Sequence, residues 1–103
     1  MVRICVMYAN EEGGTFDFDY YRDTHMAMVR EHLEPHGLKQ TGIEKGVGGG
    51  PDGKAPYLCI GSLYFDSAEQ YTAAMAAVGT VLRDDVPNYT NITPTRQISE
   101  VLD

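Results

Sequence analysis

The sequence is poor in several residue types that mark particular functions. It has no tryptophan, two cysteines and three histidines, and its 8 lysines and arginines face 15 aspartates and glutamates, which leaves a formal charge of -7. Nucleic-acid-binding proteins use basic patches to displace counterions from phosphates. The acidic balance therefore predicts no nucleic-acid partner, and it disfavours polyanions and anionic membrane surfaces for the same reason.

Long hydrophobic runs are also missing. No apolar stretch approaches the ~18–20 residues of a membrane span, and the first strand-like run meets polar residues and glycines from Asn10 onward, too early for a signal peptide. We therefore expect no membrane partner and a cytoplasmic location. In that reducing compartment, Cys5 and Cys59, which both lie in apolar runs, are predicted to be buried free thiols.

The sequence patterns of metal and nucleotide sites are absent or incomplete. There is no C-x-x-C and no H-E-x-x-H, so we expect no metal site within one chain, and no cofactor. Residues 48–54 match G-x-x-x-x-G-K, but Ala55 and Pro56 follow where a phosphate-binding loop needs Ser or Thr and then a helix. Residues 48–53 are therefore predicted to form a hairpin tip.

Hydrophobic periodicity alternates along the chain between two and about 3.6 residues and predicts six elements. The strands are expected at 2–8, 38–47, 56–65 and 92–102, one helix at 18–34, and a second helix from Ser67 that Gly79 interrupts. In the first helix, the expected buried stripe consists of Tyr21, His25, Met28, Val29 and His32.

The order β-α-β-β-α-β predicts an α+β, ferredoxin-like subunit in a single domain over residues 1–103. Right-handed crossovers then give a four-stranded antiparallel sheet with both helices on one face. The strand at 56–65 is apolar at odd and even positions alike, which is typical of a strand covered on both sides. A second subunit is the simplest cover for the bare face, so we expect two sheets to pair into a barrel-like homodimer.

His25 is the candidate for acid–base chemistry. It interrupts an apolar stripe, and an imidazole titrates near neutral pH, as a general acid or base in a pocket must. A buried histidine hydrogen-bonded to a carbonyl group or a tyrosine would show the same pattern, so both interpretations stay open. Seven of the ten aromatic residues are tyrosines, which suit an apolar pocket wall that needs hydroxyls as well as an ordinary interface.

Together the segments resemble the EthD family of the dimeric α+β-barrel superfamily, over nearly the whole chain. The residues that carry the resemblance are Phe16-Asp17, Tyr20-Tyr21-Arg22-Asp23-Thr24-His25-Met26, Gly46, Pro56-Tyr57, Ile60-Gly61, Leu63-Tyr64-Phe65-Asp66-Ser67, Asp84-Asp85-Val86-Pro87-Asn88-Tyr89-Thr90, Ile92, Pro94 and Gln97-Ile98-Ser99. Ala27 departs from the pattern, because many relatives have proline there. The resemblance implies ferredoxin-like subunits that pair through their sheets.

The family takes its name from the degradation of ethyl tert-butyl ether. Similar barrels elsewhere in the superfamily act as cofactor-free monooxygenases, isomerases, polyketide cyclases, decarboxylases or haem enzymes, and relatives are often called reductases. Likeness of fold is a weak guide to chemistry. The resemblance therefore implies a small-molecule protein of a degradation pathway without fixing its reaction.

Three functional hypotheses follow. In the first, a small apolar or aromatic molecule binds between the sheet and its own helices, His25 transfers a proton, and Tyr20, Tyr21, Asn88 and Tyr89 contact the substrate. The reaction is then a cofactor-independent oxidation of the monooxygenase type, or an isomerisation, cyclisation or decarboxylation. In the second, the protein binds a ligand without turnover, as an accessory of a degradation pathway. In the third, the dimer is only an interaction platform.

Overall fold

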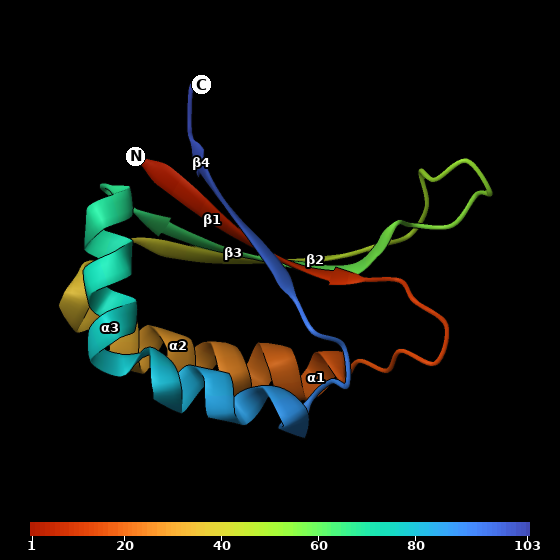
Figure 1. Ribbon diagram of the computed structural model, residues 1–103, viewed down its shortest axis with the longest axis horizontal. Helices are drawn as coiled ribbons and strands as arrows, with labels where there is room; N and C mark the ends of the chain where they lie inside the picture. The colour runs from red at the N-terminus through yellow and green to blue at the C-terminus, as the bar shows by residue number, and fades with distance from the viewer.

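The computed structural model describes residues 1–103 and contains one antiparallel sheet with every helix on one side (Figure 1). The strands are β1 (Val2–Ala9), β2 (Gln40–Lys45), β3 (Tyr57–Phe65) and β4 (Thr95–Glu100), in the order β2-β3-β1-β4. The helical segments are α1 (Phe18–Tyr20), the π-helical turn η1 (Tyr21–His25), α2 (Met26–Leu33), the 3-10 turn η2 (Glu34–His36), α3 (Ala68–Asp85) and the 3-10 turn η3 (Val86–Asn88). This architecture confirms the predicted ferredoxin-like α+β subunit. No helix is both long and apolar enough to span a membrane.

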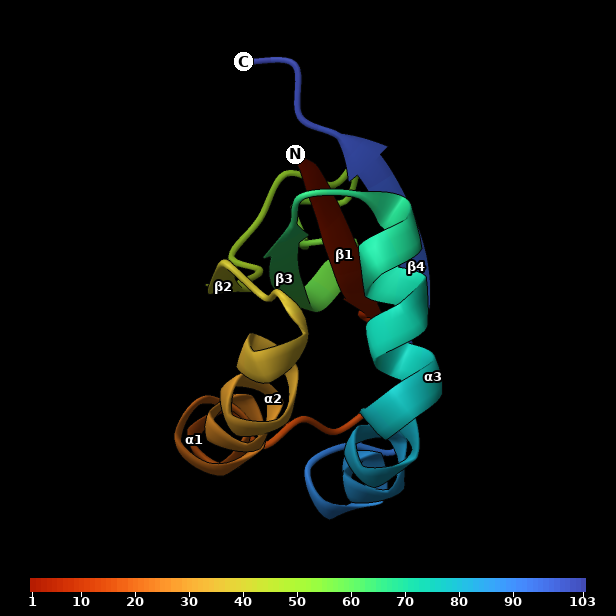
Figure 2. The same cartoon turned by 90° about the vertical axis from the view of Figure 1, so that its left-hand side faces the viewer.

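The two faces of the sheet differ as the alternation in β1 predicts. Ile4 and Tyr8 are buried beneath the helices, while Arg3, Cys5 and Met7 point to the face that no helix covers (Figure 2). Both cysteines are free thiols, as predicted, although only Cys59 is buried. Cys59 pairs in register with Tyr8 and lies on the helix side, on the opposite face from Cys5.

The first helix begins at the predicted position but contains an unexpected π-helical turn. The Asp17 carboxylate caps it by accepting a hydrogen bond from the backbone N–H of Tyr20, 3.0 Å away. Within η1 the backbone N–H of Met26 donates to the carbonyl oxygen of Tyr21, five residues earlier. Such a turn holds one residue more than an α-helical turn, so the buried side shifts along the chain.

The shift corrects part of the predicted stripe. Tyr21, His25 and Val29 are buried as expected, but Met26 and Leu33 fill the core in place of Met28 and His32, which are half-buried. A constant period of 3.6 residues predicts the wrong core positions here, because the winding of the helix changes at η1.

Two predicted boundaries are wrong. α3 runs from Ala68 to Asp85 without a break, because Gly79 is buried against Met75 and one glycine costs a helix only about 1 kcal/mol. β4 begins at Thr95 rather than at 92, since Pro94 cannot donate to a strand ladder. Residues 48–54 lie in the β2–β3 connection, which projects from the molecule and leads into a strand, as predicted (Figure 1).

Candidate functional site

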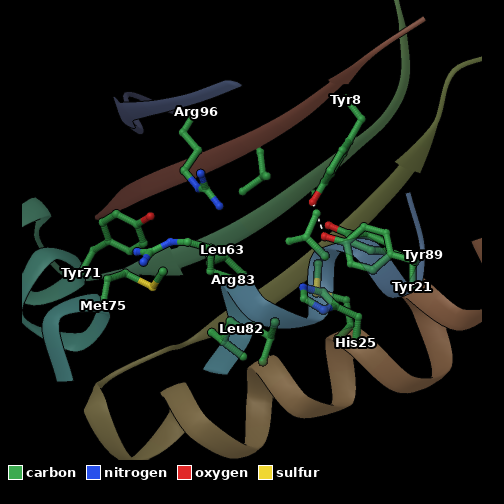
Figure 3. Close-up of a pocket in the computed structure, with 15 residues that line it drawn as sticks. Tyr8, Tyr21, His25, Leu63, Tyr71, Met75, Leu82, Arg83, Tyr89 and Arg96 are labelled. Atoms are coloured by element: carbon green, nitrogen blue, oxygen red, sulfur yellow. Dashed lines mark hydrogen bonds between the residues drawn. The ribbon is translucent and has the colours of Figure 1, made fainter. Parts of the chain in front are cut away.

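A small cavity lies between the sheet and helices α2 and α3 (Figure 3). Its volume is ≈ 40 Å³, which is room for a few water molecules. Most of the residues that line it are hydrophobic, and His25, Arg83 and Arg96 supply its charged or titratable groups together with tyrosine hydroxyls. A cavity therefore lies where the small-molecule pocket was expected, between the sheet and its own helices and with His25 in its wall, but its volume is smaller than a benzene ring needs.

The imidazole of His25 is held by a buried carboxylate from the end of α3. His25 Nδ1 lies 2.8 Å from Asp85 Oδ2, and the two residues are only 6% and 7% exposed. On the other carboxylate oxygen, Oδ1, the Tyr20 hydroxyl donates at 2.7 Å and the Asn88 side-chain amide at 2.9 Å. Three donors thus surround one carboxylate, which satisfies its charge in a buried place.

The two titratable groups differ in charge at neutral pH. Burial would raise the pKa of Asp85, but hydrogen bonds from Asn88, His25 and Tyr20 outweigh it and hold that pKa below its ordinary value. Burial lowers the pKa of His25, and the bond and charge of Asp85 offset only part of the effect. Asp85 is therefore ionised and His25 neutral at pH 7.

This charge pattern fixes the proton on the imidazole. An ionised carboxylate can only accept, so the proton of neutral His25 lies on Nδ1 and Nε2 carries a lone pair. Nε2 has no hydrogen-bond partner in the protein. Every polar side-chain atom that is fully shielded from solvent does have such a partner. Nε2 is therefore accessible to solvent, and His25 is one of the residues that line the cavity.

Tyrosine rings form the wall around this nitrogen. The Tyr21 ring stacks on the imidazole with centroids 5.4 Å apart and planes 14° apart, and the Tyr89 ring lies 4.6 Å from the imidazole. The hydroxyls of Tyr8 and Tyr89 are hydrogen-bonded at 2.6 Å. Burial raises the pKa of all three tyrosines, so their hydroxyls stay protonated and act as hydrogen-bonding groups.

A glycine in β3 makes room for this wall. A methyl group on Gly61 would collide with the Tyr21 hydroxyl, so the ring reaches the sheet only because position 61 has no side chain. The π-helical turn contributes as well, because it places Tyr21, His25 and Met26 together on the buried side.

The structure brings all five sequence-predicted site residues to one place. Tyr21, His25 and Tyr89 line the cavity, whereas Tyr20 and Asn88 lie behind Asp85 and do not. Sequence reasoning missed Asp85, Tyr8, Arg83 and Arg96 as site residues. No group of three or more His, Cys, Asp or Glu residues is arranged to hold a metal ion.

Comparisons with known proteins agree with the fold. The family model of the EthD domain matches residues 15–93. The chain is 38% identical to an EthD-like protein from Ralstonia eutropha JMP134, with a TM-score of 0.91 and coverage of 99% of this chain and 92% of that one. An ethyl tert-butyl ether degradation (EthD) family protein from Bacillus halodurans C-125 is 25% identical, with a TM-score of 0.76 and 99% of both chains covered.

A third structure shares the fold alone. A dimeric ferredoxin-like protein from an uncultured marine organism is 12% identical, with a TM-score of 0.55 and coverage of 100% of this chain and 96% of that one. A search of the curated proteins finds no match.

Proposed function

The chain belongs to the EthD family, and from that premise and the geometry of its cavity we propose that it binds a small apolar or aromatic molecule to which His25 is the proton acceptor. The accessible lone pair of Nε2 is the observation that carries this proposal. Nε2 takes a proton from an acidic C–H or phenolic O–H group of the ligand. Asp85 then stabilises the imidazolium, to which it is already hydrogen-bonded at 2.8 Å.

The other predicted residues support this step from two sides. Tyr20 and Asn88 hold Asp85 and act as positioning residues, since both donate to the same carboxylate oxygen. Tyr21 and Tyr89 contact the ligand from the cavity wall, where their rings flank the imidazole. Their protonated hydroxyls donate to the negative charge that develops when the proton leaves.

We propose a cofactor-independent oxidation of the monooxygenase type as the reaction. The carbanion or phenolate left by deprotonation is electron-rich and reacts with dioxygen. In this reaction one dioxygen molecule converts a ring CH₂ group to C=O. One of its oxygen atoms enters the product, and the other leaves as water with the two hydrogen atoms of the CH₂ group. The same proton transfer without dioxygen gives isomerisation, cyclisation or decarboxylation, and ligand binding without turnover gives the accessory protein.

Oxygen consumption separates these outcomes. The probes are any compound that native mass spectrometry detects on the purified protein and a set of phenols with an activated ring CH₂ group. His25→Asn should lower turnover about 10²–10⁴-fold, the usual contribution of a general base. His32→Asn is the matched control, because His32 lies on α2 away from the cavity. Equal turnover in wild-type and His25→Asn protein would disprove the role of His25.

The other results identify the reaction class. Product without oxygen uptake indicates isomerase, cyclase or decarboxylase chemistry, and binding without any product indicates an accessory protein. If His25 is the base, kcat/KM falls as the pH drops through the pKa of His25. That pKa lies below the ordinary value because burial disfavours the charged ring.

We also propose that two subunits pair through the bare faces of their sheets. That face carries half-buried Met7, Ile60 and Tyr64, and no element of the chain covers it. Ile60→Asp should convert a dimer into a monomer in light scattering, because pairing would bury the new charge. Val47→Asp, at an exposed position of the β2–β3 connection, serves as the control. A wild-type monomer at micromolar concentration would contradict the pairing.

A further inference from the structure

Two arginines of the cavity have no role in the proton transfer proposed above. Among the other arginines, Arg3 and Arg22 pair with carboxylates and Arg30 donates to the Thr41 hydroxyl. Arg83 and Arg96 alone among the arginines make neither a side-chain hydrogen bond nor an ion pair. They remain unpaired in a chain whose acidic residues outnumber its basic ones by 15 to 8.

Different elements direct the two guanidinium groups to one end of the cavity. Arg96 pairs in register with Val6 in β1, and both side chains lie on the helix side of the sheet. Arg83 approaches from the last turn of α3. Figure 3 shows both arginines on one side of the cavity, with Tyr8, Tyr21, Tyr89 and His25 gathered on the other.

The arginines also stand where the cavity meets an outer groove. This groove has a volume of ≈ 460 Å³ and runs past η3 and the segment before β4. Arg83, Val86 and Arg96 line both the groove and the cavity. A ligand too large for the cavity alone can therefore extend into the groove and still reach toward His25.

No carboxylate forms an ion pair with either of these two cations. Asp85 lies two residues after Arg83 in α3, but its oxygens accept hydrogen bonds from His25, Tyr20 and Asn88. The positive charge of Arg96 also acts on the tyrosine end of the cavity. It lowers the pKa of Tyr8, Tyr21 and Tyr89, although burial raises each pKa by more. Two positive groups at the mouth of an apolar cavity are the arrangement that attracts an anion.

We propose that Arg83 and Arg96 bind the anionic group of the ligand, and that the ligand is a small aromatic or cyclic carboxylic acid with its ring toward His25. This inference rests on the proposed binding function and specifies its substrate class. A carboxylate fits the planar fork of guanidinium donors. The C-terminal end of α3 and Asp84 add negative charge beside Arg83, which disfavours a doubly charged phosphate.

The test compares acids with neutral molecules of the same shape. The probes are benzoate, cyclohexanecarboxylate and 1-naphthoate, each against its amide, titrated at millimolar concentrations into labelled protein and followed by NMR shifts of cavity residues. Wild-type protein should bind at least one acid more tightly than its amide. Arg83→Gln and Arg96→Gln should each weaken that acid about ten- to a hundredfold, the usual effect of a charge-assisted hydrogen bond, and leave the amide unchanged.

The controls separate this inference from the proton-transfer proposal. Arg22→Gln removes the same charge from an exposed part of the first helix and should leave the acid's affinity unchanged. His25→Asn should lose turnover but keep the preference for acids. No acid preference in wild-type protein, or equal loss in Arg22→Gln, overturns the arginine site. Acid preference with His25→Asn fully active supports the arginine site and disproves the role of His25.

Discussion

The two ends of the cavity are built in opposite ways. At the tyrosine–histidine end, His25, Asp85, Tyr8 and Tyr89 are almost fully buried and each makes a hydrogen bond within the protein. At the arginine end, Arg83 and Arg96 are exposed and their side chains make no hydrogen bond within the protein. The polar groups named at the first end pair with each other, whereas the second end offers N–H donors that have no partner in the protein.

This difference separates groups that the fold needs from groups that it does not. A buried polar group without a partner costs the folded state about 1–3 kcal/mol, so the bonds around Asp85 support both stability and the orientation of His25. Unpaired arginines at the surface contribute little to folding. Substitutions at the two ends should therefore have different effects on stability and turnover, and four experiments test the comparison.

Asp85→Asn should have the largest effect. The side-chain amide would donate to Nδ1 of His25, so the imidazole proton would move to Nε2 and the accessible base would be lost. We expect turnover to fall about 10²–10⁴-fold. The ¹⁵N shifts of the imidazole should show the change of tautomer. Asp84→Asn, one residue earlier and exposed, should leave both unchanged, and an unaltered tautomer in Asp85→Asn would refute the role of Asp85.

Gly61→Ala should come next, because its methyl group would displace the Tyr21 hydroxyl. Overpacking of this kind typically lowers the free energy of unfolding by about 1–3 kcal/mol. Gly42→Ala is the matched control, since its methyl would meet only the Ser62 Cβ at an ordinary 3.6 Å. Urea unfolding measures both variants. Equal losses would mean that the approach of Tyr21 to the sheet is not responsible.

The Tyr8–Tyr89 hydroxyl pair should give a smaller effect. Tyr8→Phe removes the 2.6 Å hydrogen bond and should cost about 1 kcal/mol of unfolding free energy, as should Tyr89→Phe. In the double variant neither hydroxyl is left without its partner, so its loss should be less than the sum of the two. Additive losses in this double-mutant cycle would show that the hydroxyls do not stabilise each other.

Arg83→Gln and Arg96→Gln should have the smallest effect on folding. Each should change the free energy of unfolding by no more than about 0.5 kcal/mol, because neither side chain has a partner to lose. Urea unfolding in the absence of ligand is the measurement. A loss above about 2 kcal/mol, the size seen when a structural contact is broken, would place the arginines with the fold and remove the contrast between the two ends.

Much of the fold could be predicted because strong local patterns produce it. The alternation in residues 2–8 lies within the strand that it predicts, and the structure limits the helix expected at 18–34 by equally local features, the cap at Asp17 and Gly37, whose φ is 106°. The π-helical turn could not be predicted, because a periodic pattern assumes constant winding. Met26 and Leu33 were missed as core residues for that reason. The continuity of α3 at Gly79 depends on tertiary packing, which outweighs the intrinsic cost of glycine.

The site was predictable on one side only. His25 and Tyr21 stand out in the apolar stripe of a single helix, but Asp85 lies 60 residues from His25 and is one of 15 acidic residues. Tyr8 is 81 residues from its partner Tyr89. Arg96 lies on the helix side of β4 with Ile98, a clue visible only once the register of β4 with β1 is known.

The π-helical turn adds one residue to the first helix without breaking it. Its extra residue separates a leading segment, with the Asp17 cap and Tyr21, from a trailing segment anchored by Val29 and Leu33. Loss of one residue within the turn would restore α-helical winding and leave the leading and trailing segments facing almost as before, because the extra residue is held within a single turn. A deletion elsewhere in the helix would instead rotate one part against the other by about 100° per residue. The first helix can therefore lose a residue at this one place and still keep Val29 and Leu33 in the core.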